Sequence, residues 1–238
     1  MSGDGDIGGR VVLITGAGSG IGHALAERFR AEGALVAGCD LGANRAGAEK
    51  ACDRAYTCDV ADADAVARLV TDVEADLGPI DVLVANAGIA RLGAIEELPW
   101  REIEDVVRVN LFGAIHAVRA VLPSMRERGR GRIIAVASRN AEFCPPNLIG
   151  YNVSKAAVVA FTRTLARELA GTDVLVNNLI PGPTRTGMNP LGSQEPGDCY
   201  PTVRLLATLP EGGPSGRTYF QLEDYPIFSH FSDPVEAD

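Results

Sequence analysis

The chain has 238 residues, of which 46% are hydrophobic, and this size suits a single α/β domain with an ordinary core. It carries 22 Lys and Arg residues against 31 Asp and Glu residues, a net charge of −9, so its field repels nucleic acids and anionic lipids. No run approaches the roughly 20 apolar residues of a membrane span, and the N-terminus lacks the apolar stretch of a signal peptide. We therefore expect a cytoplasmic protein with no nucleic-acid or membrane partner.

The five cysteines are an odd number, include no C-x-x-C pair and have no histidine at ligand spacing. These features argue against a disulfide framework and against a zinc site. We expect reduced thiols and no bound metal at Cys39, Cys52, Cys58, Cys144 and Cys199.

Short apolar runs alternate with helix-like stretches from residue 11 to residue 180. The first run is followed by a glycine turn and a helix-like stretch over 21–30, and a longer helix is expected from Pro99 to about Arg128, where Gly129 stops it. This alternation predicts a Rossmann-like, doubly wound parallel sheet with helices on both faces. The expected strands are 11–14, 34–39, 55–58, 81–85, 132–137 and 174–180.

The composition changes in the last quarter of the chain, where nine of the fourteen prolines lie between Pro181 and Pro234. One short helix is expected near 202–207, and the rest is predicted to be loop. Because ligands of open α/β sheets bind beyond the carboxyl ends of the strands, this tail should lie over the ligand. We thus expect one catalytic, dinucleotide-binding domain over 1–238, with a flexible N-terminal arm at 1–9 and a loop-rich, substrate-covering tail at 187–238.

The sequence T-G-A-G-S-G-I-G at 15–22 lies directly between the first expected strand and the first expected helix. Gly16, Gly20 and Gly22 permit positive φ and let a pyrophosphate approach the N–H groups at the start of the helix. An ordinary glycine-rich turn is the alternative. The position after the first strand favours a dinucleotide fingerprint, although the spacing G-x-x-x-G-x-G differs from G-x-G-x-x-G.

Acidic residues follow the second and third expected strands. Asp40 lies where an acid can accept hydrogen bonds from the hydroxyls of the adenosine ribose. Its charge would repel the 2′-phosphate of NADP, and the glycine turn offers Ser19 rather than Arg or Lys, so NAD is favoured. Asp59 and Val60 could contact the adenine amino group. For both acids, capping of the next helix is the alternative.

Tyr151 and Lys155 are four residues apart on an expected helix and so share one face. A phenol that works as a base near neutral pH needs its pKa lowered by roughly 2 to 3 units, or about 3 to 4 kcal/mol. An ammonium ~4 Å away supplies about that much at an effective dielectric of about 20. Of the 22 basic residues only Lys50 and Lys155 are lysine, which favours a required ammonium at 155. A surface pair on an amphipathic helix is the alternative.

Four further polar residues complete the candidate site. Ser138 ends the fifth expected strand, where its hydroxyl could donate to a substrate oxygen, or it could be a turn serine. Asn110 lies within the long helix, where its side chain could hold a water that connects the lysine to solvent, or it could be a surface amide. Arg139 and Asn140 follow the serine, and a guanidinium there suits a substrate with a carboxylate or several hydroxyls. The alternative is that Arg139 points to solvent or pairs with Glu142.

In this order and spacing, the motifs resemble those of the short-chain dehydrogenase/reductase family of the single-domain type. The resemblance covers residues 11 to about 186. It rests on T-G-x-x-x-G-I-G at 15–22, Asp40, Asp59-Val60, N-A-G at 86–88, Asn110, Ser138, Y-N-V-S-K at 151–155 and P-G-P-T-R-T at 181–186.

The resemblance implies a sheet of about seven strands, a nicotinamide cofactor and a catalytic tetrad of Asn110, Ser138, Tyr151 and Lys155. It further implies that Lys155 binds the nicotinamide ribose, that Asn86 and Gly88 line the adenosine side, and that Thr186 contacts the nicotinamide amide. The residues assigned to the cofactor are Gly16, Ser19, Gly20, Ile21, Gly22, Asp40, Leu41, Asp59, Val60, Asn86, Gly88, Tyr151, Lys155, Pro181, Thr184 and Thr186.

The chain departs from the family pattern in two places. From Pro190 to Asp238 it lacks the long helix and the D-G-G ending that are common in the family, and V-R-L-L-A-T-L-P at 203–210 looks like the shortened tail of the carbonyl-reductase-like branch. Arg139 and Asn140 stand where small residues are usual. The tail therefore leaves the usual substrate lid and one oligomer interface outside what the resemblance implies.

We predict an NAD(H)-dependent oxidoreductase that interconverts a secondary alcohol and a ketone, with proton transfer by Tyr151. An NADP-dependent carbonyl reductase is one alternative, which the tail supports and Asp40 opposes. A catalytically silent NAD-binding sensor or scaffold is another, which the complete tetrad opposes. A homo-oligomer, dimer or tetramer, is expected through the helices that begin near Pro99 and Gly150, because Val158, Val159, Ala160 and Phe161 extend apolar surface around the second helix.

Overall fold

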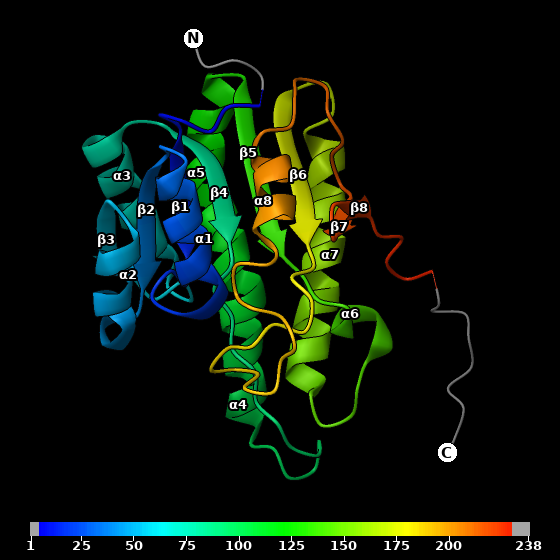
Figure 1. The fold of residues 1–238 in the computed structure, drawn as a ribbon. Helices are drawn as coiled ribbons and strands as arrows, with labels where there is room; N and C mark the ends of the chain where they lie inside the picture. Colours follow the sequence, from blue (N-terminus) through cyan, green and yellow to red (C-terminus); the bar gives the residue numbers. More distant parts are fainter. Residues whose placement is uncertain (1–4, 230–238) are drawn as a thin grey trace.

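The computed structural model describes residues 5–229, and its strands form one sheet (Figure 1). The strand order is β3-β2-β1-β4-β5-β6-β7-β8, with β1 to β7 parallel and β8 antiparallel. The chain winds outward from β1 in one direction and then from β4 in the other. The strands are β1 Val11–Thr15, β2 Leu35–Asp40, β3 Arg54–Thr57, β4 Ile80–Ala85, β5 Arg130–Val136, β6 Asp173–Leu179, β7 Thr218–Phe220 and β8 Glu223–Asp224.

The predicted doubly wound parallel sheet is confirmed, and the six expected strands lie within two residues of the observed ones. Successive side chains of a strand point to opposite faces. In β1, Val12 and Ile14 pack on one face while Val11 and Leu13 pack on the other, and all four are buried. Because helices cover both faces, the strands appear in the sequence as continuous apolar runs.

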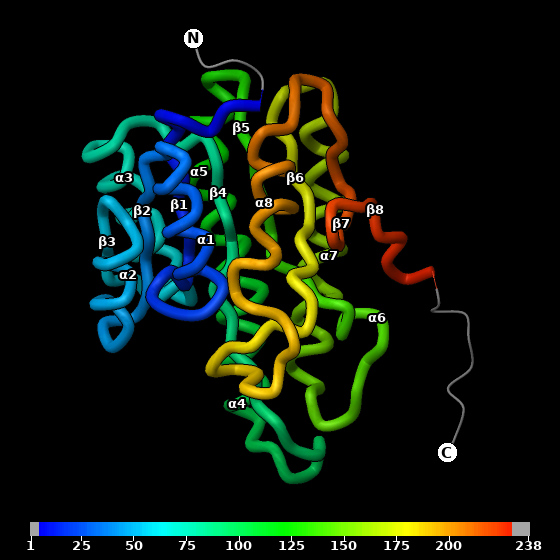
Figure 2. The backbone as a smooth tube through the Cα atoms, viewed as in Figure 1, coloured from blue at the N-terminus to red at the C-terminus, as the bar shows by residue number. Residues whose placement is uncertain are grey.

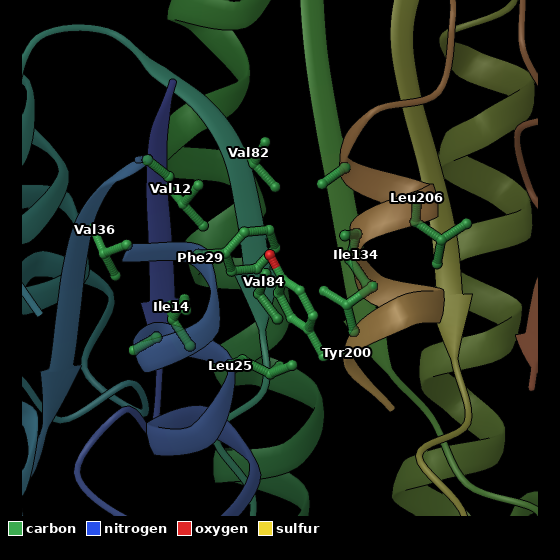
Figure 3. Packing of buried hydrophobic residues seen from close by; sticks show 14 of the residues in the cluster. Val12, Ile14, Leu25, Phe29, Val36, Val82, Val84, Ile134, Tyr200 and Leu206 are labelled. Atoms are coloured by element: carbon green, nitrogen blue, oxygen red, sulfur yellow. The ribbon is translucent and has the colours of Figure 1, made fainter. Parts of the chain in front are cut away.

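Two helical layers enclose the sheet. Side chains from α1 Gly20–Ala31, α2 Arg45–Ala51 and α8 Tyr200–Ala207 pack on one face, and those from α3 Ala63–Leu77, α5 Gly113–Glu127 and α7 Ile149–Glu168 pack on the other (Figure 1). Figure 3 shows the first of these layers, where the rings of Phe29 and Tyr200 meet edge to face with centroids 5.1 Å apart. The α8 helix, close to the short helix expected near 202–207, thereby ties the late chain to the first βα unit.

A single long helix runs from Trp100 to Glu127. It consists of α4 Trp100–Val107, the π-helical segment η2 Arg108–Phe112 and α5, and Gly129 follows its end with φ +69°. This helix was expected, but the π-helical segment around Asn110 was not. Among residues 5–229 it is also the one helix long and apolar enough to cross a membrane by length and composition. Its Val118, Val121 and Met125 are buried against the sheet.

The N-terminal segment differs from the flexible arm expected at 1–9, and the late chain lies beyond the strand ends. Ile7 is buried and the Gly9 N–H donates to the Gly33 carbonyl, so residues 5–9 of the expected arm lie against the domain. Residues 1–4 and 230–238 lie outside the described residues. Figure 2 shows the segment 181–199, yellow to orange, beyond the carboxyl ends of β4, β5 and β6. The remaining short elements are η1 Gly42–Asn44 and α6 Asn140–Phe143.

Candidate active site

The glycine turn after β1 has a backbone that requires glycine. Gly16 and Gly20 have φ of +70° and +54°. A Cβ on Gly22 would lie 2.1 Å from the Gly16 carbonyl oxygen, so the turn closes onto the start of α1 only without a side chain there. A Cβ on Gly20 would lie 3.2 Å from Thr186 Cγ2. The turn and the loop after β6, both expected to bind the cofactor, therefore face each other.

The start of α1 offers backbone donors that the protein leaves open. Ser19 is the N-cap residue, but its side chain makes no capping hydrogen bond, and the first turn, which contains Ile21, has no acidic residue. Uncapped N–H groups at a helix start, reached over glycines, suit the pyrophosphate of a dinucleotide. The residues present therefore fit a nicotinamide dinucleotide at this turn.

Asp40, at the end of β2, is held against the glycine turn. Its Oδ2 accepts from the Gly18 N–H at 2.9 Å, and its Oδ1 accepts from the Leu41 N–H at 2.8 Å and from Asn44 Nδ2 at 3.1 Å. A carboxylate offers about four acceptor positions, so three are used within the chain. About one remains for a ribose hydroxyl, and the negative charge remains in full.

Two acidic residues that follow β3, Asp59 and Asp62, make different contacts. Asp59 is exposed, and its Oδ1 accepts from the Ala61 N–H at 2.9 Å. The N-cap of α3 is Asp62, whose Oδ1 accepts from the N–H groups of Asp64 and Ala65. Those two bonds, the one from Ala65 first, lower the pKa of Asp62. Capping of α3, weighed for Asp59, thus falls to Asp62, while Val60 is buried.

The N-A-G segment at 86–88 connects two strand ends. Asn86 Nδ2 donates to the carbonyls of Thr15 and Gly16 at 3.0 and 3.2 Å, and Thr15 Oγ1 accepts from the Asn86 N–H. Asn86 thus fixes the start of the glycine turn through these hydrogen bonds. A Cβ on Gly88 would lie 3.2 Å from Asn110 Oδ1 and 3.7 Å from Lys155 Nζ. Gly88 is therefore nearer to the expected reacting groups than an adenosine-side role suggests.

The Asn110 side chain makes three hydrogen bonds inside the protein. Its Oδ1 accepts from the Ile89 N–H at 2.8 Å, and its Nδ2 donates to the Ile89 carbonyl and to Ser154 Oγ, both at 3.0 Å. The residue is buried within the π-helical segment. Both amide hydrogens are used within the chain, and the water-holding role of this side chain stays a prediction that the second acceptor position of Oδ1 would serve. The amide also fixes the loop after β4 to α7.

Ser154 was missed as a site residue although it lies within Y-N-V-S-K. It is buried, accepts from Asn110 and donates to the Tyr151 carbonyl at 2.8 Å. It thereby connects the helix that carries Asn110 with the first turn of α7. Its place one residue before Lys155 was the available signal in the sequence.

Lys155 and Tyr151 lie together on α7, as the four-residue spacing predicted. Lys155 is 4% exposed, its Nζ donates to the Val136 carbonyl at 2.7 Å, and that nitrogen lies 5.7 Å from the centroid of the Tyr151 ring. Burial lowers the pKa of Lys155 to about 8. Burial raises the pKa of Tyr151, and a hydrogen bond with Ser138 acts in the opposite direction.

The electrostatic argument from the sequence therefore needs a correction. It placed an ammonium ~4 Å from the phenol and let that charge lower the phenol pKa. In the structure, desolvation pushes Tyr151 and Lys155 toward their neutral forms, and the lowering influence on Tyr151 comes from Ser138. The reason is that sequence spacing fixes the shared face but not the depth of burial.

Ser138 follows β5, and its Oγ accepts from the Asn140 N–H at 3.1 Å. The Arg139 guanidinium carbon lies 5.1 Å from the Phe143 ring centroid and 5.6 Å from that of Phe220. Arg139 is exposed, as the solvent alternative has it, and two aromatic rings also flank its guanidinium. Arg139 thus links α6 to β7, and Asn140 contributes its backbone to Ser138.

The loop after β6 is closed by a residue that no pattern in the sequence marks. Gln194 donates its N–H to the Pro183 carbonyl, and its own carbonyl accepts from the Arg185 N–H. Within the same loop, Thr184 Oγ1 lies 3.4 Å from the Pro181 carbonyl oxygen. Thr184 is buried. These contacts hold Thr186 over Gly20.

Over the described range, no group of three or more His, Cys, Asp or Glu residues is placed to hold a metal ion. All five cysteines are unpaired, and Cys144 is the exposed one.

Comparisons with known proteins agree with this arrangement. A family model for short chain dehydrogenases matches residues 10–196. D-threitol dehydrogenase of Mycolicibacterium smegmatis is 38% identical over 180 residues, which cover 73% of this chain and 69% of the relative. The 2-dehydro-3-deoxy-L-rhamnonate dehydrogenase (NAD(+)) of a Sphingomonas species is 38% identical over 177 residues, with 73% and 71% covered.

Among solved structures, a 3-ketoacyl-(acyl-carrier-protein) reductase from Brucella melitensis, complexed with NADH, superposes with a TM-score of 0.82 at 31% identity. The match covers 89% of this chain and 96% of that one. The fold, the family model and these relatives agree, so this chain belongs to the short-chain dehydrogenase/reductase family and is an oxidoreductase that uses a nicotinamide cofactor.

Proposed function

We propose that the protein is an NAD(H)-dependent oxidoreductase that interconverts a secondary alcohol and a ketone. The observation that carries this proposal is the convergence of Ser138, Tyr151 and a buried Lys155 beside Gly88, beyond the strand ends. A hydroxyl and a phenol in hydrogen-bond contact can bind one substrate oxygen together. A buried ammonium next to them has no other evident purpose.

The nicotinamide, when bound, supplies the acceptor or donor of hydride. Tyr151 holds the proton that the substrate hydroxyl gives up, or returns it to a carbonyl, at its phenolic oxygen. Ser138 donates its single hydroxyl hydrogen to the same substrate oxygen. Lys155 has a single protein acceptor, Val136, within the part of the chain that the structure describes, so its remaining hydrogens can bind ribose hydroxyls. Asn110 positions the backbone at Ile89.

NAD is the proposed cofactor because Asp40 brings a negative charge to the place of the adenosine ribose, and like charge disfavours a 2′-phosphate. The names of two relatives point the same way, since the Sphingomonas enzyme is described with NAD(+) and the Brucella structure with NADH. The proposed partner is a small-molecule alcohol or ketone in the cytoplasm.

A homo-oligomer is also proposed, on a basis that differs from the sequence argument. Val158 and Val159 are buried within the chain and offer nothing to a partner. Phe161 is half-buried and Ala160 exposed, and the larger exposed apolar side chains are Val153 on α7 and Phe112 and Trp100 on the long helix. Such large exposed side chains on two neighbouring helices favour association of copies.

The proposal is tested by following NAD reduction across a panel of secondary alcohols with the wild type, Tyr151→Phe and Tyr225→Phe. Loss of the titrating oxygen should reduce kcat by at least about 100-fold in Tyr151→Phe, while fluorescence titration should show nearly unchanged NADH binding. Tyr225→Phe removes a phenol oxygen that donates to Glu142 of α6 and should keep its activity. Wild-type kcat in Tyr151→Phe would refute the mechanism, and an inactive wild type that binds NADH would favour the sensor.

A further inference from the structure

The loop after β4 carries an apolar side chain that is open to a ligand. This loop starts at the candidate site, because the Asn110 side chain binds the backbone of Ile89 through both its oxygen and its nitrogen. It then meets the segment before α7, where the Gly93 N–H donates to the Asn147 carbonyl at 3.0 Å. Leu92 lies between these two contacts and is 73% exposed. Figure 1 shows this loop and the loop after β6 beyond the same end of the sheet.

The loop after β6 holds two further apolar side chains on an ordered turn. The Thr186 N–H donates to the Asn189 carbonyl at 3.1 Å, and the Asn189 N–H donates to the Thr186 carbonyl at 3.1 Å. Met188, inside this turn, is 45% exposed, and Leu191, just beyond it, is 95% exposed. Thr186 also lies close to Gly20, where the cofactor is expected. The backbone of the turn is therefore fixed at the candidate site, while its apolar side chains stay uncovered.

The exposure of these three side chains is not explained by the fold. Single exposed apolar residues are normal on a protein surface, but three on two loops beyond the strand ends form a group. Within residues 5–229, Leu92, Met188 and Leu191 belong to none of the hydrophobic clusters. They are also separate from the three side chains that we assign to the association of copies. Contact with a ligand of the candidate site accounts for their position.

The cations around the candidate site are already partnered. The segments that lead from β4 to α4, from β5 to α7 and from β6 to α8 carry one arginine each. Arg91 pairs with Glu102 at 3.7 Å, and Arg185 pairs with Glu195. The third, Arg139, lies over two aromatic rings. The net charge of −9 adds a field that repels anions. These surroundings favour an uncharged substrate.

We propose that the substrate is an uncharged secondary alcohol or ketone with an apolar group of several carbons, and that Leu92, Met188 and Leu191 contact this group. The inference rests on the proposed function, because it takes the reacting carbon to lie at Ser138 and Tyr151. It adds the class of substrate, which the reacting groups alone do not select.

A series of ketones reduced with NADH tests both the apolar contact and the charge. The series is 2-butanone, 2-hexanone, 2-octanone and 7-oxooctanoate, and the last is 2-octanone with a carboxylate in place of the terminal methyl group. Complete burial of one CH2 group strengthens binding about fourfold, and the partial cover given by exposed side chains should give about twofold. From 2-butanone to 2-octanone, kcat/KM should therefore rise roughly 16-fold. 7-Oxooctanoate should have a kcat/KM about tenfold or more below that of 2-octanone.

Binding is measured separately from turnover with Tyr151→Phe saturated with NADH, by calorimetric titration of the same ketones. If the Kd falls with chain length while the wild type reduces no ketone, the proposed redox function fails and the apolar site stands. If the wild type reduces ketones but neither kcat/KM nor Kd depends on chain length, the inference is overturned and the proposed function stands. Preference for 7-oxooctanoate over 2-octanone would also overturn the inference, and absence of both turnover and binding would overturn both.

Two variants locate the contact. Leu191→Ser should reduce the rise in kcat/KM from 2-butanone to 2-octanone by about half or more, because it removes the most exposed of the three side chains. Leu35→Ser is the matched control, since Leu35 is also an exposed leucine but begins β2 at the opposite edge of the sheet. This control should keep the dependence of the wild type on chain length. The same dependence in Leu191→Ser and in the double variant Met188→Ser/Leu191→Ser would overturn the assigned contact.

Discussion

Replacement of the buried Lys155 should change how protein stability depends on pH. Burial lowers the pKa of Lys155 from its usual 10.5 to about 8. Below about pH 8, both the folded and unfolded chains carry this proton, and the folded state holds a desolvated charge. Between about pH 8 and 10.5 the folded chain releases the proton while the unfolded chain keeps it. Stability contributed by Lys155 therefore rises with pH over this window.

The size of this effect follows from the shift. One unit of pKa corresponds to about 1.4 kcal/mol, and Lys155 is 4% exposed, so solvent screening is small. Between about pH 7 and about pH 9.5, most of the proton release of the folded state is complete. The free energy of unfolding of the wild type should then rise by about 2 kcal/mol relative to that of Lys155→Met.

Urea unfolding of the two proteins at both pH values measures this difference. The chain supplies a matched control, because Lys50 is the other lysine and lies exposed on α2. Lys50→Met should differ from the wild type by the same amount at both pH values. A constant difference between wild type and Lys155→Met across the window would show that the buried ammonium is not destabilised, and the assignment of a depressed pKa would fail.

Three further outcomes are expected. Asp40→Ala should weaken NAD binding and strengthen NADP binding, and so narrow the preference for NAD, as measured by fluorescence titration with both cofactors. Tighter NADP binding by the wild type would contradict the cofactor proposal. Arg139→Ala should change KM equally for matched acidic and neutral alcohols and cost about 1 kcal/mol of stability, because its guanidinium lies on Phe143 and Phe220. A rise in KM for the acidic alcohol alone would instead make Arg139 a substrate contact. Light scattering at micromolar concentration should show a dimer or tetramer, and a monomer mass would refute the assembly.

Most strands of the sheet could be predicted from the sequence because each one is marked by a short local pattern of residues. Strands buried on both faces must be apolar throughout, and glycine turns and caps separate them from helices. The exceptions are β7 and β8, which have three and two residues. Their turn uses Gln221 and Leu222 at φ +50° and +71°, residue types that rarely adopt this conformation. The local sequence does not predict such a turn, because the pairing of β7 with β6 stabilises it.

The sequence could predict that some of the candidate residues lie together, but not all of their contacts. Tyr151 and Lys155 share a face through spacing alone, and Ser138 is placed by the end of a strand. The role of Asn110 depends on Ile89 and Ser154, which lie far from it along the chain. Contacts of that kind arise from packing of the long helix against α7. Depth of burial, which decides the pKa of both reacting groups, is likewise a property of the assembled domain.

The carboxylate of Asp40 bears on any attempt to redesign the cofactor preference. Three of its acceptor positions accept from Gly18, Leu41 and Asn44. One side chain therefore shapes this loop and, under the proposed function, also selects the cofactor. A substitution that admits a 2′-phosphate also releases two backbone N–H groups and an amide, which must find new acceptors. Engineering toward NADP therefore calls for paired changes, namely a cation near the ribose together with a neutral acceptor for the Gly18 N–H. Single replacements at position 40 should make this loop less stable without reversing the cofactor preference.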